Sequence, residues 1–303
     1  MRVIVVVGPT SVGKTKMGVE LAKALNGEII SGDSMQIYKG MDIGTAKVTQ
    51  DEMEGIIHHC VDILEPTESY SVKDFQDTVR MKIKEISEKG KIPIIVGGTG
   101  LYIKAALYDY EFKETQDDHS LIQEKYKDYD NISLYNHLCS IDEASAKELH
   151  PNNRRRVLRA IEIFEQTGEK KSSILEKQEH VCLYDAYFVG LTLDRDVLYE
   201  RINHRVDVMV DNGLEQEIDT LFKQYPLNKD HQSMKAIGYK EWFDYFDHKT
   251  TKHEMIELIK QHSRQYAKRQ YTWFKNQFDV HWYTVNLSDF SETVMNVLED
   301  IKK

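Results

Sequence analysis

The feature that most constrains this 303-residue chain is an apolar run joined directly to a glycine-rich loop near its start. The run "VIVVV" at residues 3–7 is continuous and β-branched, which is typical of a strand buried on both faces of a parallel sheet. It leads into "GPTSVGKT" at residues 8–15, the pattern G-x-x-x-x-G-K-T. Between a strand and a helix, such a loop turns its backbone amides toward a phosphate, and the helix N-terminus adds partial positive charge.

The loop predicts a phosphate-binding site, but it leaves open whether phosphate is transferred or departs as a leaving group. We expect Lys14 to reach the outer phosphate and the Thr15 hydroxyl to ligate Mg²⁺. The residues expected to bind phosphate are Gly8, Pro9, Thr10, Ser11, Val12, Gly13, Lys14 and Thr15.

Strand and helix patterns alternate through the first hundred residues. After the loop, "KTKMGVELAKAL" has helical spacing, "GEIIS", "HHCVDIL" and "IPIIV" are strand candidates, and "SVKDFQDTVRMKIKEISEKG" is a helix with Ser71 and Asp74 as a capping pair. This order predicts an α/β fold with a P-loop NTPase-like parallel sheet core. Ligands of such sheets bind at the carboxyl ends of the strands, here marked by residues 8–15, 33–36 and 97–100.

The composition changes near residue 111, where "EFKETQDDHS" is polar and the following residues are helical and charged. Strand character returns at "AYFVGLTL", and "VHWYTVNL" is a candidate last strand. We therefore expect a core formed by residues 1–112 and 181–303, with C-terminal helices, and a helical insertion domain at 113–180. Within the insertion, Asn153 is the expected cap and Gly168 the expected stop of one helix.

Two strand ends carry residues of chemical interest. Asp33 follows the second strand, so its carboxylate can face the phosphate site as a general base or a magnesium ligand, or it can simply form a turn. The fourth strand ends in "GGTG", where Gly97 and Gly98 allow another backbone or a ligand to approach closely and Thr99 follows. Many nucleotide hydrolases place an acid there, and its absence weakens an ATPase interpretation.

The net charge and the lengths of the apolar runs limit which kinds of partner the chain can have. A net charge of −10 disfavours non-specific nucleic-acid binding, and the longest apolar runs are far too short to cross a bilayer. Three separated cysteines indicate reduced thiols, and together these features predict a cytoplasmic protein. Two basic stretches remain, residues 154–159 and "KQHSRQYAKRQYTWFK", and each is either a solvated helix face or an RNA-binding surface.

The chain resembles the tRNA dimethylallyltransferases, also called tRNA isopentenyltransferases. The likeness rests on "GPTSVGKT", "DSMQIYKGMDIGTAK", "GGTGLY", "NNRRRVLRAIE", "AIGYKE" and "AKRQYTWF", which occur in family order from residue 8 to residue 274. The second of these blocks is specific to the family, whereas the phosphate loop is not. Three positions depart from the common pattern: Arg155 replaces a frequent Gln, Asn153 replaces a frequent Asp, and no arginine lies near Leu121.

The resemblance implies transfer of a dimethylallyl group from its diphosphate to the exocyclic N6 amine of the adenosine 3′-adjacent to the tRNA anticodon, with Mg²⁺ as cofactor. It makes Asp33 the base, places Thr99 at the reacting region, and assigns Lys14 and Arg205 to the departing diphosphate. It implies tRNA and dimethylallyl diphosphate as partners, with no DNA and no membrane, and we expect a monomer. The implied tRNA contacts are Asp33, Ser34, Met35, Gln36, Thr99, Arg155, Arg156, Arg159, Lys235, Gly238, Tyr239, Lys240, Lys268, Arg269, Gln270, Trp273 and Lys275.

Three other functions remain compatible with parts of the sequence. An enzyme that prenylates free adenine nucleotides would share the loop and Asp33 but would not need the basic stretches. A small-molecule kinase would bind ATP at the loop. A non-catalytic RNA-binding module would need neither Asp33 nor Thr99.

Overall fold

The structure is a computed structural model that describes residues 1–110, 120–177 and 179–303. The chain forms two compact units, one of Met1–Leu107 with Cys182–Lys303 and one of Tyr108–Val181. The expected boundary between residues 112 and 113 lies outside the described residues, and the second unit ends at Val181 rather than at residue 180. None of the described helices combines the length and the apolar character needed to cross a membrane.

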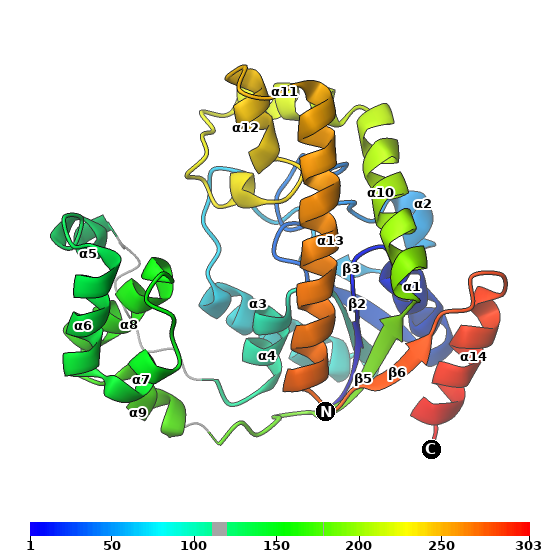
Figure 1. Cartoon of the computed structure of the whole chain (residues 1–303). Coiled ribbons are helices and arrows are strands. Elements are labelled where there is room, and N and C mark those ends of the chain that lie inside the picture. The colour runs from blue at the N-terminus through cyan, green and yellow to red at the C-terminus, as the bar shows by residue number, and fades with distance from the viewer. Residues whose placement is uncertain (111–119, 178) are drawn as a thin grey trace. The chain divides into compact units, whose positions relative to one another are not determined.

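The first unit is built on a six-stranded, entirely parallel sheet with the strand order β3-β2-β4-β1-β5-β6 (Figure 1). Its strands are β1 (Arg2–Val7), β2 (Gly27–Ser31), β3 (His58–His59), β4 (Ile92–Val96), β5 (Asp185–Thr192) and β6 (His281–Thr284). The central strand β1 is apolar and buried along Val3–Val7, because it has a neighbour on each side and helices on both faces. The parallel core predicted from the strand–helix alternation is confirmed.

The third strand is shorter than the sequence predicts. We expected it to run through "HHCVDIL", but β3 contains only His58 and His59. Cys60 and Asp62 have φ angles of 61° and 53°, in the left-handed region that a β-strand does not use. The chain therefore turns away after His59.

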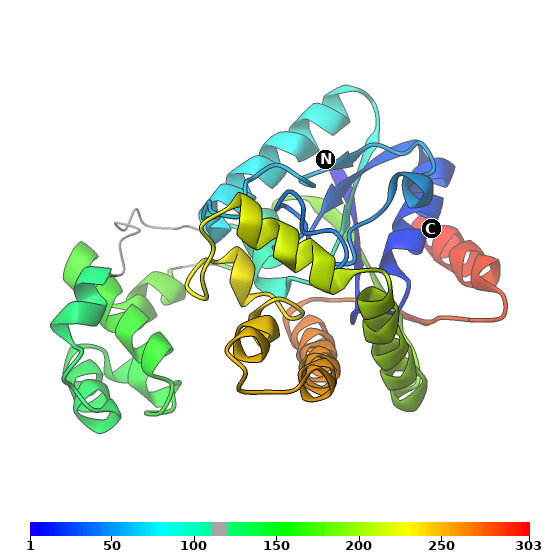
Figure 2. The same cartoon turned by 90° about the horizontal axis from the view of Figure 1, so that it is seen from above.

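Helices cover both faces of this sheet and continue beyond it (Figure 2). They are α1 (Lys14–Leu25), α2 (Gln50–Met53), α3 (Val72–Glu88), α4 (Gly100–Leu107), α10 (Arg195–Asp211), α11 (Leu214–Gln224), η1 (Ser233–Lys235), α12 (Lys240–Phe246), α13 (Lys252–Gln277) and α14 (Phe290–Ile301). Helices α1 and α14 share one core with Ile4, Val6 and Ile94 of the sheet, whereas Ile95 faces Ile103 of α4, which packs on α3. Successive strand residues point to opposite faces, so α1 and α4 lie on opposite sides.

Local sequence signals explain where several helices begin. Ser71 and Asp74 form the expected capping box at the start of α3, with each side chain accepting the backbone N–H of the other residue. The last long helix, α13, begins with an equivalent box made by Thr251 and Glu254. Helix α13 contacts α10, α12 and α4, and therefore joins the C-terminal helices to the end of β4.

The second unit is helical. Its helices are α5 (Ser120–Lys125), α6 (Asn131–Ile141), α7 (Glu143–Lys147), α8 (Arg154–Thr167) and α9 (Lys171–Glu176). Leu134, Leu138, Val157 and Ile161 form its core. Helix α8 ends at Gly168, with a φ of 71°, as the sequence predicts, but the Asn153 side chain makes no capping hydrogen bond at its start.

Candidate active site

A cavity of about 670 Å³ opens where β1 and β2 end. Its walls come from the phosphate loop with the start of α1, the ends of β2 and β4, residues 42–52, and one side of α10. The predicted site residues that line it are Thr10, Ser11, Gly13, Lys14, Thr15, Asp33, Gln36 and Arg205. Three segments far apart in the sequence therefore meet at one cavity, as expected for the carboxyl edge of a parallel sheet.

The phosphate loop is held by contacts from two distant helices. Arg205 of α10 donates to the Thr10 hydroxyl at 3.2 Å, and Arg201, one turn earlier, donates to the Ser11 carbonyl at 3.0 Å. Gln270 of α13 accepts the Thr10 amide at 2.9 Å. Within the loop, the Lys14 ammonium donates to the Pro9 carbonyl at 2.8 Å. Val12 is buried in the core beneath α1, so it supports the loop rather than facing the cavity.

Positive charge is concentrated around this loop. Burial and the neighbouring Arg205 lower the pKa of Lys14 to about 7, although the Asp33 carboxylate opposes them. Burial also lowers the pKa of Arg205, whose charge Asp33 and Glu52 stabilise. A lysine whose ammonium form is disfavoured gains charge when a polyanion approaches, so the loop is electrostatically suited to a diphosphate.

Asp33 forms a turn and also lines the cavity. Its Oδ1 accepts the Met35 amide at 2.9 Å, which is the hydrogen bond of an Asx turn, and the residue also lines the cavity. Thr99 lies beside this turn, since its hydroxyl accepts the Ser34 amide at 3.2 Å and donates to the Ser34 hydroxyl at 3.4 Å. The ends of β2 and β4 are therefore joined at the predicted reacting residues.

Gln36 is part of the same wall. Its side-chain amide donates to the carbonyls of Thr45 and Ala46 at 3.4 and 3.3 Å, and its oxygen accepts the Ser31 hydroxyl at 3.3 Å. Ser31 in turn accepts the Asp33 amide at 3.4 Å. A chain of hydrogen bonds thus connects the 45–46 backbone to Asp33.

One face of α13 packs against the end of β4. Tyr266 lies beside Thr99 and Gln270 on this face, and burial raises the pKa of Tyr266 to about 12. Gln270 is buried and also donates to the Gly98 carbonyl at 3.1 Å. A Cβ atom on Gly98 would lie 2.0 Å from the Gln270 amide, and one on Gly100 would lie 2.0 Å from the Trp273 ring. The close approach predicted at Gly98 is therefore made by a side chain of α13, whereas at the other predicted position, Gly97, a Cβ atom would lie 2.3 Å from the Gly32 backbone.

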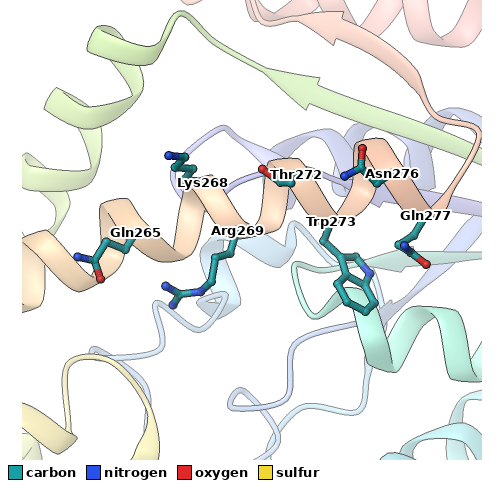
Figure 3. A pocket seen from close by; sticks show the side chains of 7 residues that line it. All are labelled: Gln265, Lys268, Arg269, Thr272, Trp273, Asn276 and Gln277. Carbon is teal, nitrogen blue, oxygen red and sulfur yellow. The ribbon is translucent and has the colours of Figure 1, made fainter. Parts of the chain in front are cut away.

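Helix α13 also carries exposed basic residues outside its contact with the end of β4. Lys268, Arg269 and Lys275 are exposed, and the Arg269 guanidinium lies 5.7 Å from the ring centre of Tyr266. A shallow hollow of about 540 Å³ lies along the helix (Figure 3). In Figure 3 Arg269, Trp273 and Gln277 point to one side of the helix and Lys268 points to the other. Charge and an aromatic ring therefore occur together on this surface.

The residues at 235–240 that are predicted to contact tRNA differ in their exposure to solvent. Lys235 and Lys240 are exposed, whereas Gly238 and Tyr239 are buried. The Tyr239 hydroxyl donates to Glu217 of α11 at 2.6 Å. The lysines, and not Tyr239, are the members of this group that present polar atoms to solvent.

The arginines of the second unit also differ in exposure. Arg155 and Arg156 are exposed on α8, while Arg159 pairs with the buried Glu162 at 2.7 Å. Lys171 is half-buried at the start of α9, and burial together with the charges of Arg156 and Arg159 lowers its pKa. Three cations thus cluster in this unit, and Lys171 is one that the motifs did not predict.

Sequence inspection also missed three residues of the first unit. Arg201 is four residues before Arg205, and Tyr266 is four before Gln270, so helical spacing gives a usable signal for both. Glu217 gives no such signal, because its partners are about 175 positions away. Among the described residues, no group of three or more His, Cys, Asp or Glu side chains is arranged to hold a metal ion.

Together, the parallel sheet, the phosphate loop and the cationic cavity define an α/β phosphate-loop protein with an acid beside its anion site. A family model described as IPP transferase matches residues 36–277. A tRNA dimethylallyltransferase of Bacillus cytotoxicus is 52% identical over 98% of this chain and 95% of its own length.

Solved structures give the same result. A tRNA isopentenylpyrophosphate transferase of Staphylococcus epidermidis matches with a TM-score of 0.74 and 46% identity, covering 99% of this chain and 98% of that one. A eukaryotic dimethylallyltransferase acting on tRNA matches with a TM-score of 0.86 and 32% identity, covering 98% and 77%. The chain belongs to the IPP transferase family and is a prenyltransferase.

Proposed function

We propose that this prenyltransferase moves a dimethylallyl group from dimethylallyl diphosphate to the exocyclic N6 amine of the adenosine 3′-adjacent to the anticodon of a tRNA. The observation that carries the proposal is that the phosphate loop and Asp33 line one cavity, with Lys14 and Arg205 beside them. This arrangement provides cations for a leaving diphosphate and a carboxylate for the incoming amine. Relatives named for this reaction on tRNA support it.

The chemistry requires one bond to form and one to break. The allylic C–O bond breaks, its electron pair leaves with diphosphate, and a C–N bond forms to the adenosine amine. The amine loses a proton, which Asp33 is positioned to accept. Negative charge develops on the departing oxygen, so the loop amides, Lys14 and Arg205 stabilise the transition state more than the bound donor.

Magnesium is the proposed cofactor. The Thr15 hydroxyl and the Asp33 carboxylate both line the cavity, and hard oxygen ligands of this kind suit Mg²⁺ together with substrate phosphates. We assign Thr15 as the protein ligand. The ion would supply charge neutralisation for the diphosphate.

The exposed basic residues of α8, α13 and the 235–240 segment suit the acceptor RNA. Phosphates would meet Arg155, Arg156, Lys235, Lys240, Lys268, Arg269 and Lys275, which are all exposed. A mononucleotide acceptor needs no such surface, and a kinase would use neither this surface nor the family-specific "DSMQIYKGMDIGTAK" block. We further propose that the enzyme acts as a monomer on the anticodon stem-loop in the cytoplasm, without a DNA or membrane partner.

The test is direct. The purified protein is incubated with dimethylallyl diphosphate, Mg²⁺ and unmodified tRNA, and the tRNA nucleosides are analysed by mass. We expect prenylated adenosine from tRNA, none from free AMP, and no product when Mg²⁺ is chelated. Product from AMP alone would replace the proposed acceptor, and phosphate transfer from ATP would replace the proposed reaction.

A further inference from the structure

Glu217, in the first turn of α11, makes an unusual set of contacts with a loop far away in the sequence. Its Oε2 accepts the amides of Asp42 and Ile43 at 2.9 and 2.7 Å, and its Oε1 accepts the amide of Gly44 at 3.2 Å. Oε1 also accepts the Tyr239 hydroxyl at 2.6 Å. One carboxylate thus receives four donors, three of them from consecutive backbone amides.

Tyr239 also packs closely against this loop. A Cβ atom on Gly44 would lie 2.4 Å from the Tyr239 ring, so only glycine leaves room for the ring at that position. Tyr239 belongs to the 235–240 segment, whose exposed Lys235 and Lys240 are proposed to meet RNA. The segment that would meet RNA is therefore packed directly on the 42–44 loop.

The 42–46 stretch is also part of the cavity. Asp42, Ile43, Thr45 and Ala46 line it, and the carbonyls of Thr45 and Ala46 hold the Gln36 amide. Gln36 is linked through Ser31 to the backbone of Asp33. Glu217 lies outside the cavity lining, yet it fixes the backbone that leads to the proposed base.

From these contacts we propose that Glu217 is a positioning residue that couples RNA docking at residues 235–240 to the acceptor side of the cavity. The coupling passes through Tyr239 and the 42–46 backbone to Gln36 and Asp33. This inference rests on the proposed function, since it assumes that the acceptor is an RNA whose base enters the cavity.

The substitution Glu217→Gln is a sharp test because Glu217 receives only donors. A glutamine would turn one acceptor into an NH₂ group, which either opposes backbone amides that cannot rotate or forces the Gly44 amide and Tyr239 apart. The matched control is Glu215→Gln on the same helical turn, since Glu215 pairs with Lys252 at 2.6 Å and touches neither the loop nor the cavity lining. Tyr239→Phe keeps the ring over Gly44 and removes one hydrogen bond.

Each protein is titrated with inorganic pyrophosphate to give its affinity and binding stoichiometry, and prenyl transfer is then followed in a single turnover at saturating tRNA. We expect Glu217→Gln to bind pyrophosphate like the wild type, at full stoichiometry, while the transfer rate falls about ten- to a hundredfold because the acceptor is misplaced. Tyr239→Phe should show a smaller loss and Glu215→Gln none.

Two results would overturn the inference. One is an unchanged transfer rate in Glu217→Gln, and the other is a loss of pyrophosphate stoichiometry that accounts for the whole loss of activity, as expected of a purely structural residue. If Glu217→Gln does not fold, Tyr239→Phe decides, because a transfer rate equal to that of the wild type contradicts the coupling. A wild-type protein that prenylates no tRNA would refute the proposed function instead.

Discussion

The two sides of the cavity are built in different ways. The side proposed to bind diphosphate is largely one continuous segment, residues 8–15, completed by Arg201 and Arg205 from a single helix. The side proposed to receive the acceptor is assembled from the ends of β2 and β4 and the 42–46 stretch, which side chains of α11 and α13 hold in place. A local motif can therefore supply most of the proposed anion site, whereas the proposed acceptor site exists only when distant segments are folded together.

The substitution Asp33→Ala should distinguish the two sides most clearly, because it should change prenyl transfer and not pyrophosphate binding. Asp33 lines the cavity, but the phosphate loop does not hydrogen-bond to it, so pyrophosphate affinity should stay near that of the wild type. Loss of the proposed base should lower single-turnover transfer about 10²–10⁴-fold. Near-normal transfer would leave Asp33 as the residue of an Asx turn only, and Asp33→Asn, which preserves the turn, controls for its loss.

Lys14→Met tests the diphosphate side. Removing a cation that stabilises the leaving group should slow transfer about 10²–10³-fold even at saturating donor. If saturating donor restores the rate completely, Lys14 contributes binding energy but nothing specific to the transition state.

The pH dependence of the same variant adds a second measurement. Because the pKa of Lys14 is lowered to about 7, the uncomplexed lysine is mostly neutral at pH 8.5, and a bound diphosphate should restore its proton. Wild-type affinity for pyrophosphate should therefore fall as pH rises above 7, more steeply than the affinity of Lys14→Met. Comparing the two proteins removes the titration of pyrophosphate itself, and parallel pH profiles would show that Lys14 takes up no proton.

Gln270→Ala should affect both sides at once, because this side chain joins the Thr10 amide to the Gly98 carbonyl. Leaving two buried polar groups without partners should lower the free energy of unfolding by about 1–3 kcal/mol. Displacement of the loops should slow transfer about ten- to a hundredfold. The control is Gln265→Ala on the exposed side of α13, and equal melting temperatures for the two variants would argue against the bridge.

Part of the fold follows from short-range sequence patterns, and part depends on contacts between distant residues. The phosphate loop, the strands flanking it and the capping box of α3 follow from neighbouring residues, so pattern alone predicts them. The left-handed backbone at Cys60 and Asp62 left no such signal, and the third strand was predicted too long. The partner of Gly98 is 172 positions away, so the sequence indicates that a glycine is needed there but not which side chain fills the space.

Exposure was the other property that motifs could not supply. Gln270 and Tyr239 lie within motifs that the family resemblance assigns to RNA, yet both are buried with their polar atoms engaged inside the protein. Their neighbours Lys268, Arg269 and Lys240 are exposed. A motif can indicate which segment binds a partner. Whether a given side chain of that segment is exposed to the partner depends on how the segment packs.

The smallest expected effect concerns the exposed basic residues. Changing them should alter RNA binding and leave both sides of the cavity intact. Arg156 on α8 and Lys268 on α13 are exposed, and neither lines the cavity beside the phosphate loop. If both meet RNA phosphates, reversing them to Glu should weaken tRNA binding and reduce the slope of log affinity against log salt by roughly one per lost phosphate contact, or less. Pyrophosphate affinity should not change.

The matched control reverses two charges that are already paired elsewhere on the surface, Lys147 with Glu143 and Lys223 with Asp219. Both variants then differ from the wild type by the same net charge, so a general electrostatic repulsion of RNA would weaken them equally. Only direct phosphate contacts predict that the Arg156 and Lys268 reversal flattens the salt dependence while the control does not. Identical slopes for the two double variants would mean that these basic residues are solvated helix faces, and would favour a mononucleotide as the acceptor.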